Sequence, residues 1–229
     1  MDIGPNILNL KQWIPQKDVI RLILKHLNPT DWKIVWAAHS KKYQKKLIKD
    51  PEFWKDCARY GYLDLIIWGE DVSACCSNLV FARTIFDIAV TYGHLHILKW
   101  GLREGFKPEG TEYMYIAAKN GYAEILQWCF DIRSHRMTDS EESELKLLYM
   151  KAIPGGHLNI IECLKENGIV PLYQFGYNVA RCNQLHMLIW LRQNFYTAQQ
   201  NYWIYIQDLT TCPNIKAWLE EQIKKMTKV

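Results

Sequence analysis

The chain has 229 residues, a formal net charge of +4, and 49% hydrophobic and 23% charged residues. This length allows one sizeable domain or a small domain joined to a larger one, and the composition is that of an ordinary folded protein. The small net charge predicts no nucleic-acid partner, and the one dense basic run, Lys41, Lys42, Lys45 and Lys46, is typical of a solvated helix face. No run of about 18 apolar residues occurs, so we expect no membrane partner.

The cysteines predict a reducing compartment. There are seven, an odd number, and none forms a CxxC pair. Most lie in apolar helical stretches, where a free cysteine packs as a small hydrophobic residue. We therefore expect reduced thiols in an intracellular protein, cytoplasmic or nuclear. The N-terminus has neither the basic start nor the continuous apolar core of a signal peptide.

The first 54 residues predict three short helices. Apolar side chains recur at helical spacing over residues 19–27, and Asn28-Pro29-Thr30-Asp31 ends that helix and caps the next. A second apolar series covers residues 34–47, and a further break lies at Asp50-Pro51. None of this stretch fits the repeat that follows it.

This order of helices and breaks resembles an F-box. The matching residues are Ile23-Leu24, Leu27, Asp31 and the closing run Asp50-Pro51-Glu52-Phe53-Trp54. The resemblance implies that residues 1–54 form an F-box-like domain that binds the Skp-type adaptor of a host cullin–RING ubiquitin ligase. A helical cap on the first repeat would need an apolar stripe as well, so that alternative stays open. The stripe expected to enter the adaptor groove is Ile14, Pro15, Ile20, Ile23, Leu24 and Leu27.

From residue 57 onward one phrase recurs. It reads CARYGYLDLIIW at 57–68, AVTYGHLHILKW at 89–100 and AAKNGYAEILQW at 117–128. Two further copies, AIPGGHLNIIEC and VARCNQLHMLIW, occupy 152–163 and 179–190, and a worn sixth ends at Trp218. Such self-similarity at a fixed period is the mark of a repeat protein.

Each copy predicts a helix, a tight turn and a second helix around a central pivot. The pivot needs a left-handed backbone, which glycine adopts freely and asparagine more readily than other residues. A small residue four positions earlier lets the two helices approach, and apolar positions after the pivot supply the second helix. One pair cannot bury its apolar face alone, so neighbouring pairs should stack. The pivots are Gly61, Gly93, Gly121, Gly156 and Asn183.

The phrase resembles divergent ankyrin repeats with the signature G-H-L-x-[IV]-[LV]-x-W-L, common in large DNA viruses of protists and amoebae. The pivots lie 27 to 35 residues apart, around the ankyrin period of about 33. The resemblance implies about five degenerate ankyrin-like repeats over residues 55–229. No copy has T-P-L-H-x-A, which leaves the β-hairpin fingers of ordinary ankyrin repeats open.

The target-binding face should lie on the concave inner helices and the connectors. The longer connectors are 69–82 and 131–144, and insertions in repeat proteins usually emerge on one face. Thr138 and Glu141 form a capping box for the helix after the second connector. The candidate anchors for the target are Tyr113, Tyr115, Tyr149 and Tyr177. The alternative role of each of these tyrosines is packing within the protein.

No arrangement of catalytic or metal-binding residues is evident. Four histidines in or beside the turns, His94, His96, His157 and His186, are expected to bond local backbone. Cys182 and His186 alone do not make a zinc site, and no phosphate-binding or nucleophile motif occurs. We therefore expect no enzyme activity, cofactor or metal.

Together these features predict an all-α protein, an F-box-like domain followed by an ankyrin-like helical-hairpin solenoid. The expected function is that of a substrate receptor, which links an unknown protein target bound by the repeats to a host SCF-type ubiquitin ligase. The alternative is an ankyrin-type scaffold or inhibitor without a ligase link, in which the N-terminal helices only cap the solenoid.

Overall fold

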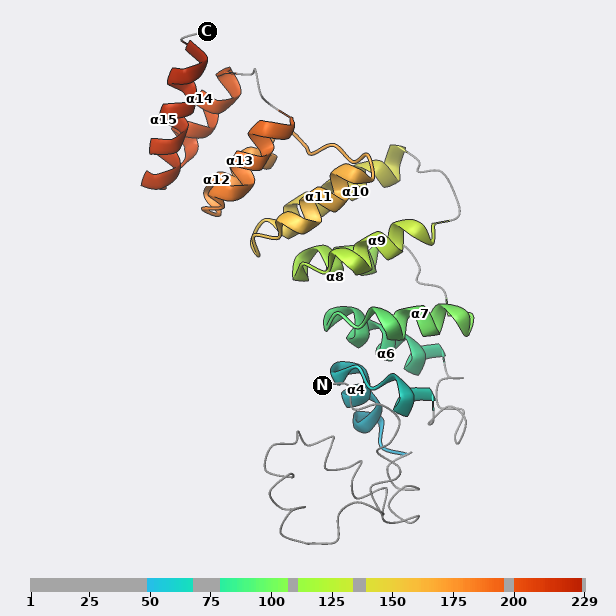
Figure 1. Cartoon of the computed structure of the whole chain (residues 1–229). Coiled ribbons are helices and arrows are strands. Elements are labelled where there is room, and N and C mark those ends of the chain that lie inside the picture. Colours follow the sequence, from blue (N-terminus) through green and yellow to red (C-terminus); the bar gives the residue numbers. More distant parts are fainter. Residues whose placement is uncertain (1–48, 68–78, 107–110, 134–138, 196–199, 228–229) are drawn as a thin grey trace, which may run out of the picture. The chain divides into compact units, whose positions relative to one another are not determined.

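The computed structural model describes residues 49–67, 79–106, 111–133, 139–195 and 200–227 (Figure 1). Every regular element in these ranges is a helix, and none of their residues is in a strand, which confirms the all-α class for this part of the chain. The chain divides into two compact units, Met1–Pro108 and Glu109–Val229. None of the described helices is long and apolar enough to cross a membrane.

The described part of the first unit holds α4 (Pro51–Tyr60), a short helical stretch at 63–67, α6 (Leu79–Thr91) and α7 (Leu95–Arg103). Helix α6 contacts both α4 and α7. The order helix, turn, helix therefore occurs twice, and each turn lies where the sequence has a pivot glycine.

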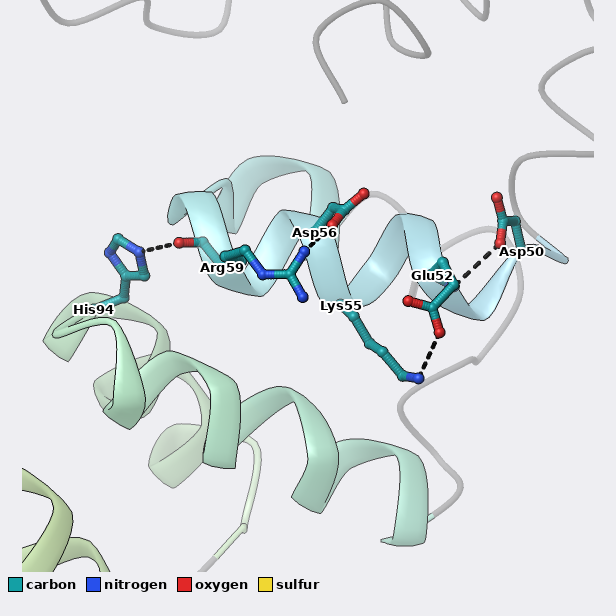
Figure 2. Close-up of polar contacts among 6 residues, drawn as sticks. All are labelled: Asp50, Glu52, Lys55, Asp56, Arg59 and His94. Atoms are coloured by element: carbon teal, nitrogen blue, oxygen red, sulfur yellow. Dashed lines mark hydrogen bonds and ion pairs between the residues drawn. The ribbon is translucent and has the colours of Figure 1, made fainter. Parts of the chain in front are cut away.

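Helix α4 begins where its sequence dictates. The Glu52 backbone N–H donates to Asp50 Oδ1 at 3.1 Å, and Pro51, which has no N–H to satisfy, opens the first turn (Figure 2). Lys55 pairs with Glu52 at 2.6 Å, and Arg59 pairs with Asp56. The Lys55–Glu52 pair lies at the surface and contributes little, so the N-cap and the buried face are the main features that hold the helix in place.

The expected domain boundary between residues 54 and 55 falls inside α4. Phe53 and Trp54 are buried in the same helix as Cys57 and Ala58, with no break between them. The run Asp50 to Trp54, which the sequence analysis placed at the end of an F-box-like domain, thus forms the start of the first hairpin's first helix.

The second unit is a row of helical hairpins (Figure 1). The two helices of each hairpin contact each other, and successive first helices are also in contact, α8 with α10, α10 with α12 and α12 with α14. Among the second helices, α9 contacts α11. The four hairpins are α8 (Glu112–Asn120) with α9 (Ala123–Asp131), α10 (Asp139–Ala152) with α11 (Leu158–Glu166), α12 (Phe175–Arg181) with α13 (Leu185–Asn194), and α14 (Gln200–Leu209) with α15 (Pro213–Thr227).

One burial pattern repeats in the first helices. Around each of the five pivots, the residues eight, seven, four and three positions earlier are buried, as Tyr113, Met114, Ala117 and Ala118 are before Gly121. These offsets define a single apolar stripe at the helical period. The second helices bury a matching set, such as Ile160, Ile161, Cys163 and Leu164 on α11.

The five pivots all have the left-handed backbone that the sequence analysis expects there. Their φ angles run from 58° at Asn183 to 82° at Gly93. After each pivot the next backbone N–H donates to the carbonyl four residues before the pivot, as Tyr122 does to Ala117 at 3.0 Å. The turn thereby satisfies carbonyls that the ending helix leaves open.

Candidate interaction surface

Side chains at the start of the second helices α7, α11 and α13 reach the turn of the preceding hairpin. In the first unit, His94 Nε2 donates to the Arg59 carbonyl at 2.8 Å, and His96 Nε2 donates to the Gly61 carbonyl at 2.9 Å (Figure 2 shows the former). Because a carbonyl oxygen only accepts, Nε2 of each ring carries the proton. The two bonds join one hairpin to the next at the pivot.

The same link recurs in the second unit. His157 Nε2 donates to the Lys119 carbonyl at 3.1 Å, and Asn159 Nδ2 donates to the Gly121 carbonyl at 2.8 Å. One hairpin later, His186 Nε2 donates to the Gly156 carbonyl at 3.1 Å. The prediction that these histidines bond local backbone is wrong. Their partners lie 30 to 38 residues earlier in the chain, because stacked hairpins bring successive turns together.

This stacking adds a second reason for glycine at a pivot. A Cβ on Gly61 would lie 2.7 Å from His94 Nδ1, and one on Gly121 would lie 2.5 Å from His157 Nδ1. Both distances are shorter than real Cβ contacts. At Gly61 and Gly121 the pivot must therefore be left-handed and also free of a side chain, so that the next hairpin's imidazole can lie directly on the backbone.

The first helices of the second unit present a continuous set of side chains away from their buried stripe. We call this set the first-helix face. It consists of the residues nine, six, five and two positions before each pivot, with matching positions on α14. Its members are Glu112, Tyr115, Ile116 and Lys119, then Leu147, Met150, Lys151 and Pro154, then Gln174, Tyr177, Asn178 and Arg181, and finally Asn201, Ile204, Tyr205 and Asp208.

Two of the four candidate tyrosines lie in the core and not on this face. Tyr149 is fully buried, and its hydroxyl donates to the Ile169 carbonyl at 2.7 Å. Burial raises the pKa of that phenol. Tyr113 is also buried. The structure therefore removes Tyr113 and Tyr149 from the expected target-binding set, since they lie at the inward phase of α8 and α10.

The other two candidates do lie on the first-helix face. Tyr115 and Tyr177 are half-buried and occupy equivalent positions, six residues before their pivots. The Tyr115 hydroxyl donates to the Glu144 carbonyl at 3.3 Å, and Lys151 Nζ lies 5.8 Å from the centre of the Tyr115 ring. Tyr115 therefore has a fixed position between α8 and α10, with a cation over its face.

Large apolar side chains on the surface were missed by the sequence analysis. On the first-helix face, Leu147 is 44% exposed, Ile204 37% and Tyr205 51%. Tyr173, in the connection before α12, is 54% exposed, and its ring packs edge-on against Tyr202 at 4.6 Å. For Leu147, Ile204 and Tyr205, the signal that could have identified them was their helical phase relative to the buried stripe.

The described cysteines have the character of core residues. Burial raises the pKa of the Cys129 thiol to about 12 and that of the Cys163 thiol to about 11. Nearby acidic groups add to both shifts: Cys163 acts on Cys129, and Glu166 and Asp131 act on Cys163. Neither is therefore a thiolate nucleophile at neutral pH. None of the five cysteines in the described ranges is in a disulfide, and the same ranges contain no cluster of three metal-binding side chains.

The adaptor-binding candidates Ile14, Pro15, Ile20, Ile23, Leu24 and Leu27 lie outside the described residues, as do Thr138 and the lysine run. Comparison with known proteins adds no assignment, because no family model, no curated protein and no solved structure matches this chain.

Proposed function

We propose that this chain is a protein-recognition module that binds its target on the first-helix face of the second unit. One observation carries the proposal. Successive first helices present exposed side chains at equivalent positions, and among them are Leu147, Ile204 and Tyr205. Large apolar and aromatic side chains on a fixed framework are the usual anchors of protein interfaces.

The hairpin row supports an ankyrin-like solenoid as the framework. Its hairpins stack on sequence neighbours, the pivots are left-handed, and side-chain bonds link one turn to the next. In such arrays each repeat contacts its neighbours, and the repeated face forms an extended binding surface. The proposal involves no catalysis and no cofactor.

Site-specific photo-crosslinking tests where the target binds. A photoreactive phenylalanine analogue is placed at Leu147 on the first-helix face, and a matched control carries it at Glu162, exposed on α11. We expect a discrete protein adduct from position 147 and none from 162. Equal adducts from both positions would remove the first-helix face as the binding surface.

A ligase link is a second proposal, carried by the F-box resemblance of residues 14–31. The closing part of that resemblance, Phe53 and Trp54, is buried in α4, so adaptor binding rests on the apolar stripe from Ile14 to Leu27. In this proposal the chain delivers the target of its hairpins to a Skp-type adaptor of a host cullin–RING ubiquitin ligase.

Size-exclusion chromatography with a purified Skp-type adaptor tests the link. Co-elution that is lost in the double variant Ile23→Asp, Leu27→Asp, with unchanged circular dichroism, would support a substrate receptor. Absence of co-elution for the natural sequence would leave a recognition scaffold whose N-terminal helices cap the first hairpin.

A further inference from the structure

The first-helix face carries one exposed cation from each of three successive hairpins. Lys119 lies in the last turn of α8, Lys151 lies in the last turn of α10, and Arg181 ends α12. All three are exposed, and none forms an ion pair with another described residue. They are available to a partner.

Acidic groups on the same helices lie at the opposite end. Glu112 begins α8, and Glu144 lies in the first half of α10, where Thr111 Oγ1 donates to its carboxylate at 3.4 Å. The face therefore has a basic edge next to the turns, and Glu112 is its one acidic member at the connector end of the described helices. On α14, Asp208 takes the place of the cation and ends the basic edge.

Tyrosines adjoin the basic edge. Tyr115 and Tyr177 lie one turn before Lys119 and Arg181, and Lys151 Nζ sits over the Tyr115 ring at 5.8 Å. A carboxylate of a bound peptide would thus meet a cation. The aliphatic stem of that cation and the neighbouring tyrosine ring would contact the next residue of the peptide.

The spacing of the hairpins fixes the pattern that such a peptide would need. Packed helices lie about 8–10 Å apart, and an extended chain advances about 3.3 Å per residue. One step from a first helix to the next therefore corresponds to about three residues of extended peptide. The three long, flexible cations can follow this spacing although Lys151 lies one turn earlier than the other two.

We propose that the first-helix face binds an extended acidic segment of its partner protein, with a carboxylate at every third residue opposite Lys119, Lys151 and Arg181. This inference rests on the proposed recognition function and adds the chemistry of the partner. Complementary charge fixes the register of the segment, and apolar residues between the carboxylates contact Tyr115 and Tyr177.

Fluorescence anisotropy with the full chain tests the inference. The probe is a labelled synthetic peptide with aspartate at every third position and leucine or serine between, compared with a peptide of the same composition whose aspartates are adjacent. We expect the spaced peptide to bind more tightly. The variant Lys119→Gln, Lys151→Gln, Arg181→Gln should weaken its binding by about tenfold or more.

The matched control removes three cations elsewhere. Lys99→Gln, Lys216→Gln, Lys224→Gln lowers the net charge equally, and all three side chains are exposed. We expect it to change the affinity less than about twofold, since none of the three lysines belongs to the first-helix face. Equal losses in the two triple variants would overturn the proposal, as would equal affinity for the spaced and the clustered peptide.

A charge-reversal pair keeps the test independent of folding defects. The variant Lys119→Glu, Arg181→Glu should no longer bind the aspartate peptide and should instead bind a peptide with lysine at the same positions. Failure of both peptides, with circular dichroism unchanged, would contradict the inference. The inference would also be overturned if a single-stranded oligonucleotide bound more tightly than the peptide and the triple Gln variant lost that binding. The basic edge would then be assigned to nucleic acid.

The outcome is separable from that of the proposed function. A discrete adduct at position 147 without peptide binding at about 1 mM overturns only the acidic-segment inference. Absence of both the adduct and the peptide binding would contradict the recognition function of the first-helix face.

Discussion

Replacing Gly121 by alanine should cost much more stability than the same change at Gly168. Both glycines have nearly equal positive φ, 79° and 78°, and both lie in the second unit. At Gly121 the new Cβ would lie 2.5 Å from His157 Nδ1, whereas nothing lies within 4 Å at Gly168. The pair therefore separates the cost of left-handed backbone from the cost of displacing the next hairpin.

The two costs can be estimated. A left-handed non-glycine residue costs about 1–2 kcal/mol, which is the whole effect expected for Gly168→Ala. At Gly121 the imidazole must also move, which breaks its 3.1 Å bond to the Lys119 carbonyl. That loss and the disturbed packing add about 1–2 kcal/mol, so Gly121→Ala should cost about 3 kcal/mol in total.

Urea denaturation followed by tryptophan fluorescence measures both free energies of unfolding. A background of His157→Ala provides the control, because removal of the ring should bring the cost of Gly121→Ala down to that of Gly168→Ala. Equal costs at the two glycines in the natural background would refute the claim that the imidazole of one hairpin rests on the pivot of the preceding one.

Further predictions concern the core and its thiols. Tyr149→Phe should lower the free energy of unfolding by about 1–3 kcal/mol, because the Ile169 carbonyl loses its buried donor. Tyr115→Phe, at a half-buried site, should cost less. Thermal unfolding compares the two variants, and equal losses of stability would contradict the burial of Tyr149 in the core. Cys129 and Cys163 should resist iodoacetamide at pH 8 in the folded protein and react in urea, as peptide mass spectrometry would show; labelling of the folded protein at either residue would contradict their burial. Their thiols have folded pKa values of about 12 and about 11, above the ordinary 9.0, so their contribution to stability is complete below pH 9.0 and is lost as pH rises toward these values. The double variant Cys129→Ala, Cys163→Ala should therefore show a smaller fall in unfolding free energy between pH 9 and pH 11 than the natural chain, and an identical fall would refute the assignment.

The hairpins could be predicted from the sequence because their signals are local. A left-handed turn selects glycine or asparagine, and Asn183, the one substitution among the pivots, keeps a φ of 58°. Apolar residues at helical spacing fixed the second helices in the same way. Both signals act within a few residues and need no knowledge of the neighbouring hairpin.

The inter-hairpin links could not be predicted in this way. His157 and Lys119 are 38 residues apart, and nothing in either segment indicates that the turns meet. The sequence showed a histidine beside a turn, for which a local backbone partner was the simplest expectation. Only the stacking of hairpins identifies the carbonyl that accepts the bond.

The errors in the candidate site come from helical phase. Tyr113 and Tyr149 differ from Tyr115 and Tyr177 by only one or two positions relative to the pivot, yet the former pair is buried and the latter half-exposed. The small residue four before each pivot marks the inward face and would have distinguished them. The same phase places Phe53 and Trp54 on the buried face of α4.

The most direct test of the recognition function measures how tightly the target protein crosslinked at position 147 binds two single variants of this chain. Leu147→Asp lies on the first-helix face, and Ile189→Asp lies on the second helix α13; the two side chains are 44% and 36% exposed. We predict that calorimetry shows a loss of about tenfold or more for Leu147→Asp and little change for Ile189→Asp. An unchanged affinity for Leu147→Asp, or a larger loss for Ile189→Asp, would contradict the proposed function.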